Sequence, residues 1–418
     1  MRIAPARARA GVTLAELILA TGLASIVVAA TVSIVDTTLS LWTRGETVRQ
    51  AREEGAAVLS ILGDDLRQIH GGEEGDLLVD WEIFDLERDG VIERLHPRLR
   101  FIRDAAASEV ARIERRRLAS EARAARDRLA LEAGDDAQQL AEALSEEELL
   151  GAAGLDAEQV ALGMLGAPDL RASRLVEVLY AVVPEGRDGD RRYTGVLYRA
   201  ERLHTPDTPP VLLGDGAFDR SGTPDLSLAR EVARGVLWMQ PLMATQTTRL
   251  TPGEDGRIGW DTARTAAGAA TSWDAWRLGR PDPDLTFWNE PSPGMPRAGE
   301  RPLLPRRIRV ELEIQRPGDF DRAPRLLESV EESAEFFTVT NGAALRPAVG
   351  GHVLVAGEWM ELKRVTGDRV VVRRATRGTA RRRLPMESRV LFGESVDLDL
   401  PIALHEDNWR LTLGEGDR

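Results

Sequence analysis

The segment from residue 12 to residue 35 constrains the fold of this chain more than any other part of the sequence. It reads VTLAELILATGLASIVVAATVSIV and is almost wholly apolar or small. At 1.5 Å per residue it forms about 36 Å of helix, which is enough to cross the roughly 30 Å hydrocarbon core of a bilayer. The sequence therefore predicts one membrane-spanning helix near the N-terminus.

A cleavable secretory signal peptide is the alternative interpretation of this segment. Val28, Ala29 and Ala30 offer the small-residue cleavage site that such a peptide needs. A retained helix is favoured because the apolar run is longer than a usual signal sequence, contains Glu16 and continues into an amphipathic pattern. A carboxylate inside a membrane costs about 3 kcal/mol or more, so Glu16 is expected to have a partner there.

The amphipathic pattern covers residues 36–71. Apolar residues recur at steps of three and four as far as Ile69, charged residues fill the other faces, and Gly71-Gly72 ends the pattern. We expect this half of the helix to pack on a globular head. Two helices joined near Gly45 are the alternative, because glycine weakens a helix interior.

The composition limits the number of domains and the kinds of partner and chemistry that this chain can have. With 418 residues, 43% hydrophobic and 29% charged, the chain is long enough for two or three domains. A formal net charge of -13 gives it no general phosphate-binding surface, so we expect no nucleic acid as a partner. The sequence has no cysteine, which excludes disulfides, thiolate metal sites and cysteine nucleophiles.

Residue patterns typical of enzymes are missing from the sequence. The five histidines are scattered without metal-ligand spacing, and there is no glycine-rich phosphate loop, GxSxG or HExxH. We therefore expect no enzymatic activity, catalytic residue, cofactor or metal site. A calcium ion at Asp188 and Asp190, which lie in a polar turn, is the less favoured alternative to solvent.

The head is predicted to be an antiparallel sheet, which makes the fold class α+β. Runs rich in β-branched and aromatic residues predict strands over 98–103, 175–183, 193–200, 308–314 and 396–401. Residues 184–190 are predicted to be a hairpin turn between the second and third of these strands. The head would then comprise residues 72–103, residues 173–318, and a final strand and tail over 393–418.

Two stretches look like inserts in this head. Residues 104–172 predict a charged helical insert, with a basic helix over 109–131 followed by acidic helices. A solvated decoration is the favoured interpretation, and a docking arm for a partner is the alternative.

Residues 319–392 predict a small basic insert of short strands with glycine turns at residues 356–358 and 366–368. Part of this stretch resembles a small β-barrel module found in phage tail and other structural proteins. Its core, residues 349–383, carries nine basic residues, Lys363, Arg364, Arg369, Arg373, Arg374, Arg377, Arg381, Arg382 and Arg383. A solvated charged hairpin is favoured here over a site for an acidic partner.

The residues Gly11-Val12-Thr13-Leu14-Ala15-Glu16 resemble the cleavage and methylation motif of type IV prepilins and type II secretion pseudopilins. Family members usually have Phe where this chain has Val12. The resemblance implies that residues 1–11 are a leader, that a prepilin peptidase cuts after Gly11, and that the new amine of Val12 is methylated. In a bundle of such helices, the Glu16 carboxylate of one subunit would meet the Val12 amine of a neighbour and set their axial register.

Five further marks resemble the J-type minor pseudopilin and, less closely, the W-type minor pilins. They are Asp65-Leu66-Arg67, Leu197-Tyr198-Arg199, residues 232–239, the pair Trp273 and Trp276, and Leu304-Pro305 before the strand at 308–314. The resemblance implies a structural subunit of the pseudopilus of a type II secretion system. It also implies a single-pass protein of the bacterial inner membrane, with a periplasmic head and other pilin-like subunits as partners.

Two other functional classes remain open at this point. One is a minor pilin of a surface type IV pilus, in which the inserts would act as an adhesin or tip decoration. The other is a membrane-anchored periplasmic binding or hydrolytic protein that uses only the pilin export route.

Overall fold

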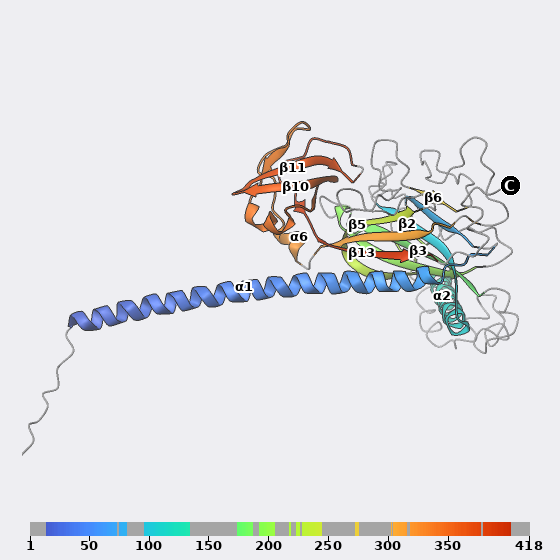
Figure 1. The fold of residues 1–418 in the computed structure, drawn as a ribbon. Helices are drawn as coiled ribbons and strands as arrows, with labels where there is room; N and C mark the ends of the chain where they lie inside the picture. The colour runs from blue at the N-terminus through green and yellow to red at the C-terminus, as the bar shows by residue number, and fades with distance from the viewer. Residues whose placement is uncertain are drawn as a thin grey trace, which may run out of the picture. The chain divides into compact units, whose positions relative to one another are not determined.

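The computed structural model of the chain describes residues 14–72, 75–81, 96–133, 174–186, 192–204, 217–218, 223–225, 228–244, 272–275, 302, 304–315, 318–377 and 379–402. The chain divides into two compact units, Met1–Gln50 and Ala51–Arg418. Helix α1, Leu14–Arg67, is one helix of 54 residues that contributes to both units (Figure 1). The alternative of two helices joined near Gly45 is therefore wrong.

The part of α1 in the first unit is long and apolar enough to cross a membrane by its length and composition. This candidate span is Leu17–Leu39, with a mean hydropathy of 2.3. Several of its hydroxyl groups donate within the helix: Ser25 donates to the carbonyl of Thr21 at 2.9 Å, and Thr31 donates to that of Val27 at 2.8 Å. Internal pairing of this kind is what a polar side chain in a lipid environment requires.

The second unit contains an eight-stranded antiparallel sheet in the order β13-β7-β5-β4-β3-β2-β1-β6 (Figure 1). Its strands are β1 Leu77–Trp81, β2 Pro97–Asp104, β3 Leu175–Pro184, β4 Gly195–Leu203, β5 Ala229–Ala244, β6 Trp273–Asp274, β7 Arg307–Ile314 and β13 Glu394–Pro401. The five strands predicted from the sequence are confirmed as β2, β3, β4, β7 and β13. An N-terminal apolar helix and a large antiparallel sheet make the fold α+β.

Strand β5 is the longest strand of the sheet, and the sequence did not predict it. It is buried along its whole second half, so no polar face marks it. It also contains Pro241, which has no N–H to donate and is therefore found mainly where one edge of a strand is unpaired. At Pro241, β5 pairs with Val310 of β7 on one side, whereas its other neighbour β4 pairs only with residues from Ala229 to Val236.

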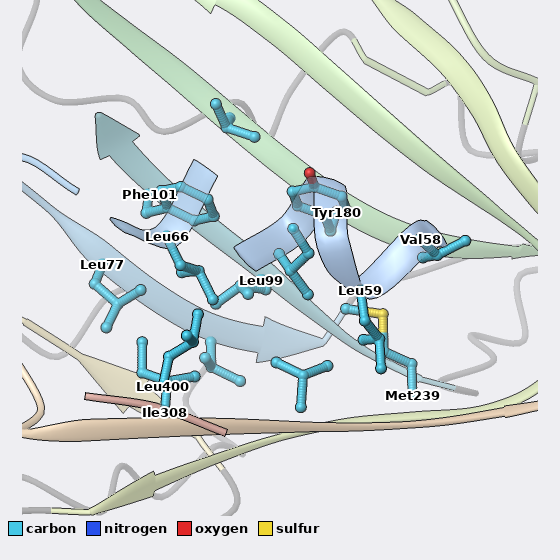
Figure 2. Close-up of a cluster of buried hydrophobic side chains, with 14 of the residues drawn as sticks. Val58, Leu59, Leu66, Leu77, Leu99, Phe101, Tyr180, Met239, Ile308 and Leu400 are labelled. Carbon is cyan, nitrogen blue, oxygen red and sulfur yellow. The ribbon is translucent and has the colours of Figure 1, made fainter. Parts of the chain in front are cut away.

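The second half of α1 packs its apolar face on this sheet. Val58, Leu59 and Leu66 are buried and belong to one core with Met239 of β5 and Leu99 of β2. Figure 2 shows Leu59 and Leu66 directed towards these strand side chains. Burying each such side chain contributes about 2 kcal/mol, so the packed face rather than helix propensity fixes this half of the helix.

The helix ends earlier than the sequence predicted. The expected end was residue 71, but α1 ends at Arg67. The next residues pair with β2 instead: the N–H of Asp104 donates to the carbonyl of Gln68 at 2.8 Å, and that of His70 donates to the carbonyl of Ile102 at 2.9 Å. Residues 68–70 therefore form backbone hydrogen bonds with β2 instead of continuing the helix to Gly71-Gly72.

Helix α2, Ala107–Ala133, leaves the sheet at the end of β2 and confirms the predicted basic helix. The chain returns beside its point of departure, because the N–H of Ala105 donates to the carbonyl of Arg174 at 2.7 Å. The favoured interpretation of a solvated decoration is wrong for the first half of α2, where Val110 and Ile113 are buried in the main core. The predicted acidic helices lie outside the described residues.

A second sheet of five strands, in the order β12-β9-β10-β11-β8, lies in sequence between β7 and β13 (Figure 1). Its elements are α6 Asp319–Arg322, β8 Phe336–Thr338, the 3-10 helix η4 Gly342–Ala348, β9 His352–Val355, β10 Glu358–Thr366, β11 Arg369–Thr376 and β12 Val390–Leu391. Ile314 and Glu394 pair directly, so the chain leaves and re-enters the large sheet at one point. We call the stretch between them the five-stranded module.

The two glycine turns predicted for this module are confirmed. Ala356 and Gly357 connect β9 to β10 with φ angles of 47° and 80°, and positive φ at both positions is typical of a type I′ hairpin turn. Isolated bridges pair Arg325 with Arg389, beside β12, and Leu326 with Val339, beside β8. The segment 325–326 thus bridges both edges of this sheet.

Candidate functional site

The residues that the sequence assigns to processing lie outside the described part of the chain. These are Gly11 and Val12, and the side chain of Glu16 is likewise not described. What the structure does describe is the helix that follows them. From Leu17 to Val35 this helix carries no charged residue, and its large apolar side chains are exposed.

An exposed apolar helix is itself a candidate functional surface. Leu17, Leu19 and Ile26 are each more than half exposed, as are most of their apolar neighbours. Water-soluble monomers rarely expose contiguous apolar patches larger than a few hundred Å². The first unit therefore presents an apolar helical surface that is long enough to span a membrane.

A buried ionic cluster fixes the end of α1 to the large sheet. Asp65 is 6% exposed and accepts a hydrogen bond from the Tyr180 hydroxyl at 2.6 Å. The guanidinium of Arg199 donates to both oxygens of Asp65, at 2.7 and 3.1 Å. Arg103 forms a further ion pair with Asp65 at 3.0 Å. Burial, and then the Asp65 charge, raise the pKa of Tyr180, so its hydroxyl keeps the proton that it donates.

The cluster continues from Arg199 to α2. Arg199 donates to Glu201, which is 1% exposed and also accepts from Arg112 at 2.8 Å and from Arg116 at 2.9 Å. Burial by itself would raise the pKa of Glu201, but Arg199 and Arg112 outweigh it and lower the pKa to about 2. Two arginines of α2 thus pair with one carboxylate of β4, and this ionic pairing adds to the apolar packing of α2.

Two of the sequence marks meet in this cluster. Asp65 of Asp65-Leu66-Arg67 contacts Arg199 of Leu197-Tyr198-Arg199, and Leu66 and Leu197 enter the same apolar core. The described member of the tryptophan pair, Trp273, is fully buried in that core, whereas Trp276 lies outside the described residues. These three marks therefore contribute to the core on which α1 packs.

The basic residues of the five-stranded module are for the most part engaged locally. Arg374 is 3% exposed and donates twice to Glu358, at 2.7 and 2.6 Å, so the solvated interpretation is wrong for this arginine. Arg373 pairs with Glu361 at the surface at 2.8 Å. Arg377 instead leaves the module and donates to Glu313 of β7 at 2.7 Å.

The described histidines do not converge on a common site. His204 contacts Glu177 at 3.0 Å and His70 contacts Asp104 at 3.2 Å. Within the described ranges, no group of three or more His, Asp or Glu residues is placed to hold a metal ion. The polar turn with Asp188 and Asp190 lies outside those ranges.

Comparisons of the chain with models of protein families, with curated proteins and with solved structures found no match. A function is therefore indicated only by features of the chain itself: the short N-terminal motif, the apolar helix that follows it, and the way that helix joins the sheet.

Proposed function

We propose that this chain is a minor pseudopilin, a structural and assembly subunit of the pseudopilus of a type II secretion system. Its N-terminal helix would anchor it in the bacterial inner membrane, with the head in the periplasm. The observation that carries the proposal is helix α1 itself. One uninterrupted helix combines an exposed apolar half, Leu17–Leu39, with a half that packs on an antiparallel sheet.

The N-terminal motif gives the proposal a second line of support. A prepilin peptidase acting after Gly11 would leave the Val12 amine and the Glu16 carboxylate close together at the start of this helix. In lipid, each of these charges needs an opposite charge. Neighbouring subunits of the same kind supply it, so the pair would couple anchoring to assembly. Other pilin-like subunits, the peptidase and the inner membrane are the partners in this proposal.

A minor pilin of a surface type IV pilus is the second candidate. The five-stranded module favours it, because the chain enters and leaves the module at the paired residues Ile314 and Glu394. A module attached in this way is suited to the decoration of a filament tip. The processing and the anchoring would be the same in both candidates.

Processing is tested by coexpressing the chain with a prepilin peptidase and determining the N-terminal mass of the product. We expect a mature chain that starts at Val12 and carries an N-methyl group. Gly11→Leu should leave an unprocessed precursor in the membrane. Gly22→Leu is the matched control, because Gly22 lies within α1, away from the cleavage junction, and has open space around it, so it should be processed normally. A start near Thr31 would indicate a secretory signal peptide instead.

The two assembly roles are separated in the cell of origin. Deletion of the chain should leave the secreted proteins in the periplasm if it is a pseudopilin, and should remove surface pili if it is a minor pilin. A deletion strain that keeps both secretion and pili would contradict both roles and favour an anchored binding protein.

A further inference from the structure

The five-stranded module is positively charged although the chain as a whole is acidic. Residues 315–393 contain 14 Lys and Arg residues and 10 Asp and Glu residues, which is a formal charge of +4 in a chain with a net charge of -13. A domain whose charge is opposite to that of the rest of the protein is attracted to anionic surfaces.

Part of this positive charge lies on the outward face of the hairpin formed by β10 and β11. Val370 and Val372 of β11 are buried in the core of the module. Because side chains alternate along a strand, Arg369 and Arg373 are directed to the opposite face, and both are exposed.

A bulge in β10 adds two successive cations to this face. Leu362 pairs with Val372 but Arg364 pairs with Val371, so Lys363 is an extra residue in the register. Strict alternation after the buried Leu362 would turn Arg364 towards the core, and a bulge redirects the side chains that follow it. Both Lys363 and Arg364 are exposed.

These cations outnumber the carboxylates around them. Glu361 is the carboxylate that β10 places on this face, and it pairs with both Lys363 and Arg373. Arg364 has no carboxylate partner among the residues that the structure describes. The outward face of the hairpin therefore keeps an excess of positive charge.

An exposed aromatic ring accompanies the cations. Phe336 of β8 pairs with Val371 of β11, and 47% of the residue is exposed. The guanidinium of Arg369 lies 4.0 Å from the centroid of the Phe336 ring. Cations beside an exposed apolar ring are typical of surfaces that lie on a membrane, where the ring enters the headgroup layer and the cations remain near the phosphates.

The module joins the large sheet at the end that is nearest to the candidate membrane span along α1. Arg52 pairs with Glu394, the first residue of β13, whereas Gly63, further along the helix, lies against Leu398. Arg52 follows Leu39, the end of the candidate span, by thirteen residues. With α1 in a membrane, the module therefore joins the head about 20 Å of helix beyond the span.

The hairpin is long enough to cover that distance. Trp359, at its base, packs on Trp238 of the large sheet with ring centroids 5.7 Å apart, and the turn after Thr366 is at the opposite end. Over the seven residues from Trp359 to Thr366, a strand rises roughly 23 Å. Arg364 and Arg369 flank this turn.

We propose that the outward face of the β10–β11 hairpin binds anionic phospholipid headgroups of the membrane that α1 spans. Arg364, Arg369 and the neighbouring cations pair with lipid phosphates, and the Phe336 ring enters the headgroup layer. This contact rests on the membrane anchor of the proposed function and gives the head a second, reversible attachment to the same membrane. An acidic protein would also match the charge, but it would leave the exposed ring and the position near the span unexplained.

The experiment uses the full chain, reconstituted in lipid nanodiscs through α1. The chain has no cysteine, so Thr366→Cys carries a single environment-sensitive NBD fluorophore at the exposed turn. Nanodiscs of phosphatidylcholine are compared with nanodiscs in which about one third of the lipid is phosphatidylglycerol. We expect the emission to be about twofold higher with phosphatidylglycerol and to fall as salt is added, because salt screens the attraction.

A pair of double variants tests whether the cations beside the turn cause this increase. Arg364→Gln/Arg369→Gln, in the labelled chain, should remove most of it. Arg381→Gln/Arg383→Gln is the matched control, because it removes the same charge from exposed positions beyond β11. The control should keep the increase, and both variants should unfold at the temperature of the parent.

Two results would overturn the proposal: no increase in emission with phosphatidylglycerol, or an equal loss of the increase in the two double variants. A larger increase on adding polyglutamate to the phosphatidylcholine nanodiscs would assign this face to an acidic protein instead. A chain that does not enter nanodiscs would contradict the anchor and this contact together, whereas cleavage after Gly11 is measured separately.

Discussion

Asp65, near the end of α1, accepts two hydrogen bonds from the guanidinium of Arg199 in β4, at 2.7 and 3.1 Å, across 134 positions of sequence. This contact joins the anchoring helix to the sheet. Because Tyr180 and Arg103 also converge on Asp65, its carboxylate satisfies several buried groups at once.

Asp65→Asn should lower the free energy of unfolding by about 3 kcal/mol, because Arg103 and Arg199 each lose one of their carboxylate partners and keep only Glu109 and Glu201. Urea denaturation of the full chain in detergent, followed by tryptophan fluorescence, measures the loss. Asp64→Asn is the matched control. That residue pairs with Arg67 at the surface, and exposed pairs contribute about 0–1 kcal/mol. Equal losses in the two variants would show that the Asp65 cluster does not stabilise the junction.

The lowered pKa of Glu201 predicts that the free energy of unfolding depends on pH. Its pKa falls from 4.5 to about 2 on folding, so its contribution is fully present above about pH 5 and is lost as the pH falls towards 2. A shift of this size corresponds to a contribution on the order of 3 kcal/mol.

Glu201→Gln should therefore flatten the decrease in unfolding free energy between about pH 5 and pH 2. Glu332→Gln, at an exposed position, controls for the loss of one negative charge. Denaturation at a series of pH values makes the comparison, and parallel curves for parent and Glu201→Gln would contradict the assignment.

Gly55 allows α1 to approach β13 closely. A Cβ atom at this position would lie 2.6 Å from Cγ2 of Val396, whose branched side chain has little freedom to move. Gly55→Ala should therefore destabilise the head by about 1–3 kcal/mol, less the roughly 1 kcal/mol gained in helix propensity. Val396→Ala should restore much of the loss in the double variant. Gly45→Ala is the control for helix propensity, because a Cβ atom there would meet nothing within 4 Å. An equal change in unfolding free energy in the two alanine variants would show that Gly55 has no packing role.

Glu16→Gln tests the proposed assembly contact. The change removes one charge but little volume, so membrane insertion and cleavage after Gly11 should continue. Incorporation beside other pilin-like subunits should weaken by about 3 kcal/mol or more, since a neighbour's Val12 amine would lose its partner. Chemical crosslinking of the processed protein measures incorporation. A variant that crosslinks as well as the parent would favour a subunit at the very tip, with no neighbour ahead of it.

Deletion of the two predicted inserts, residues 104–172 and 319–392, should affect the folding of the head differently. Loss of residues 105–168 removes Val110 and Ile113 from the core and two cations from Glu201, so we expect no protease-resistant head. Loss of residues 322–391 with a short linker should leave a folded but weaker head, because Ile314 and Glu394 are already neighbours.

The weakening in the second deletion comes from Trp238, which packs with Leu354, Trp359 and Leu391 of the module and would become exposed. Exposure of one such side chain costs about 2–3 kcal/mol. Limited proteolysis compares the two deletions, and a resistant head in the first or none in the second would reverse this assignment of core and insert.

Local signals in the sequence determined much of the secondary structure. The apolar run predicted α1, β-branched alternation predicted β2, β3, β4, β7 and β13, and the glycine turns of the module are where they were expected. Each of these features depends on a few consecutive residues, and so a single sequence is enough to specify it. The same holds for the short motif from Gly11 to Glu16, on which the proposed function depends.

The partners of the charged residues were decided only by the tertiary structure. The sequence shows Asp65, Arg199 and Glu201 as ordinary surface types, and their burial becomes visible only when α1, β4 and α2 meet. The same is true of α2, whose charged sequence is typical of a solvated helix although its first half is buried. Burial and ion pairing depend on contacts between distant parts of the chain, and a local sequence pattern does not show such contacts.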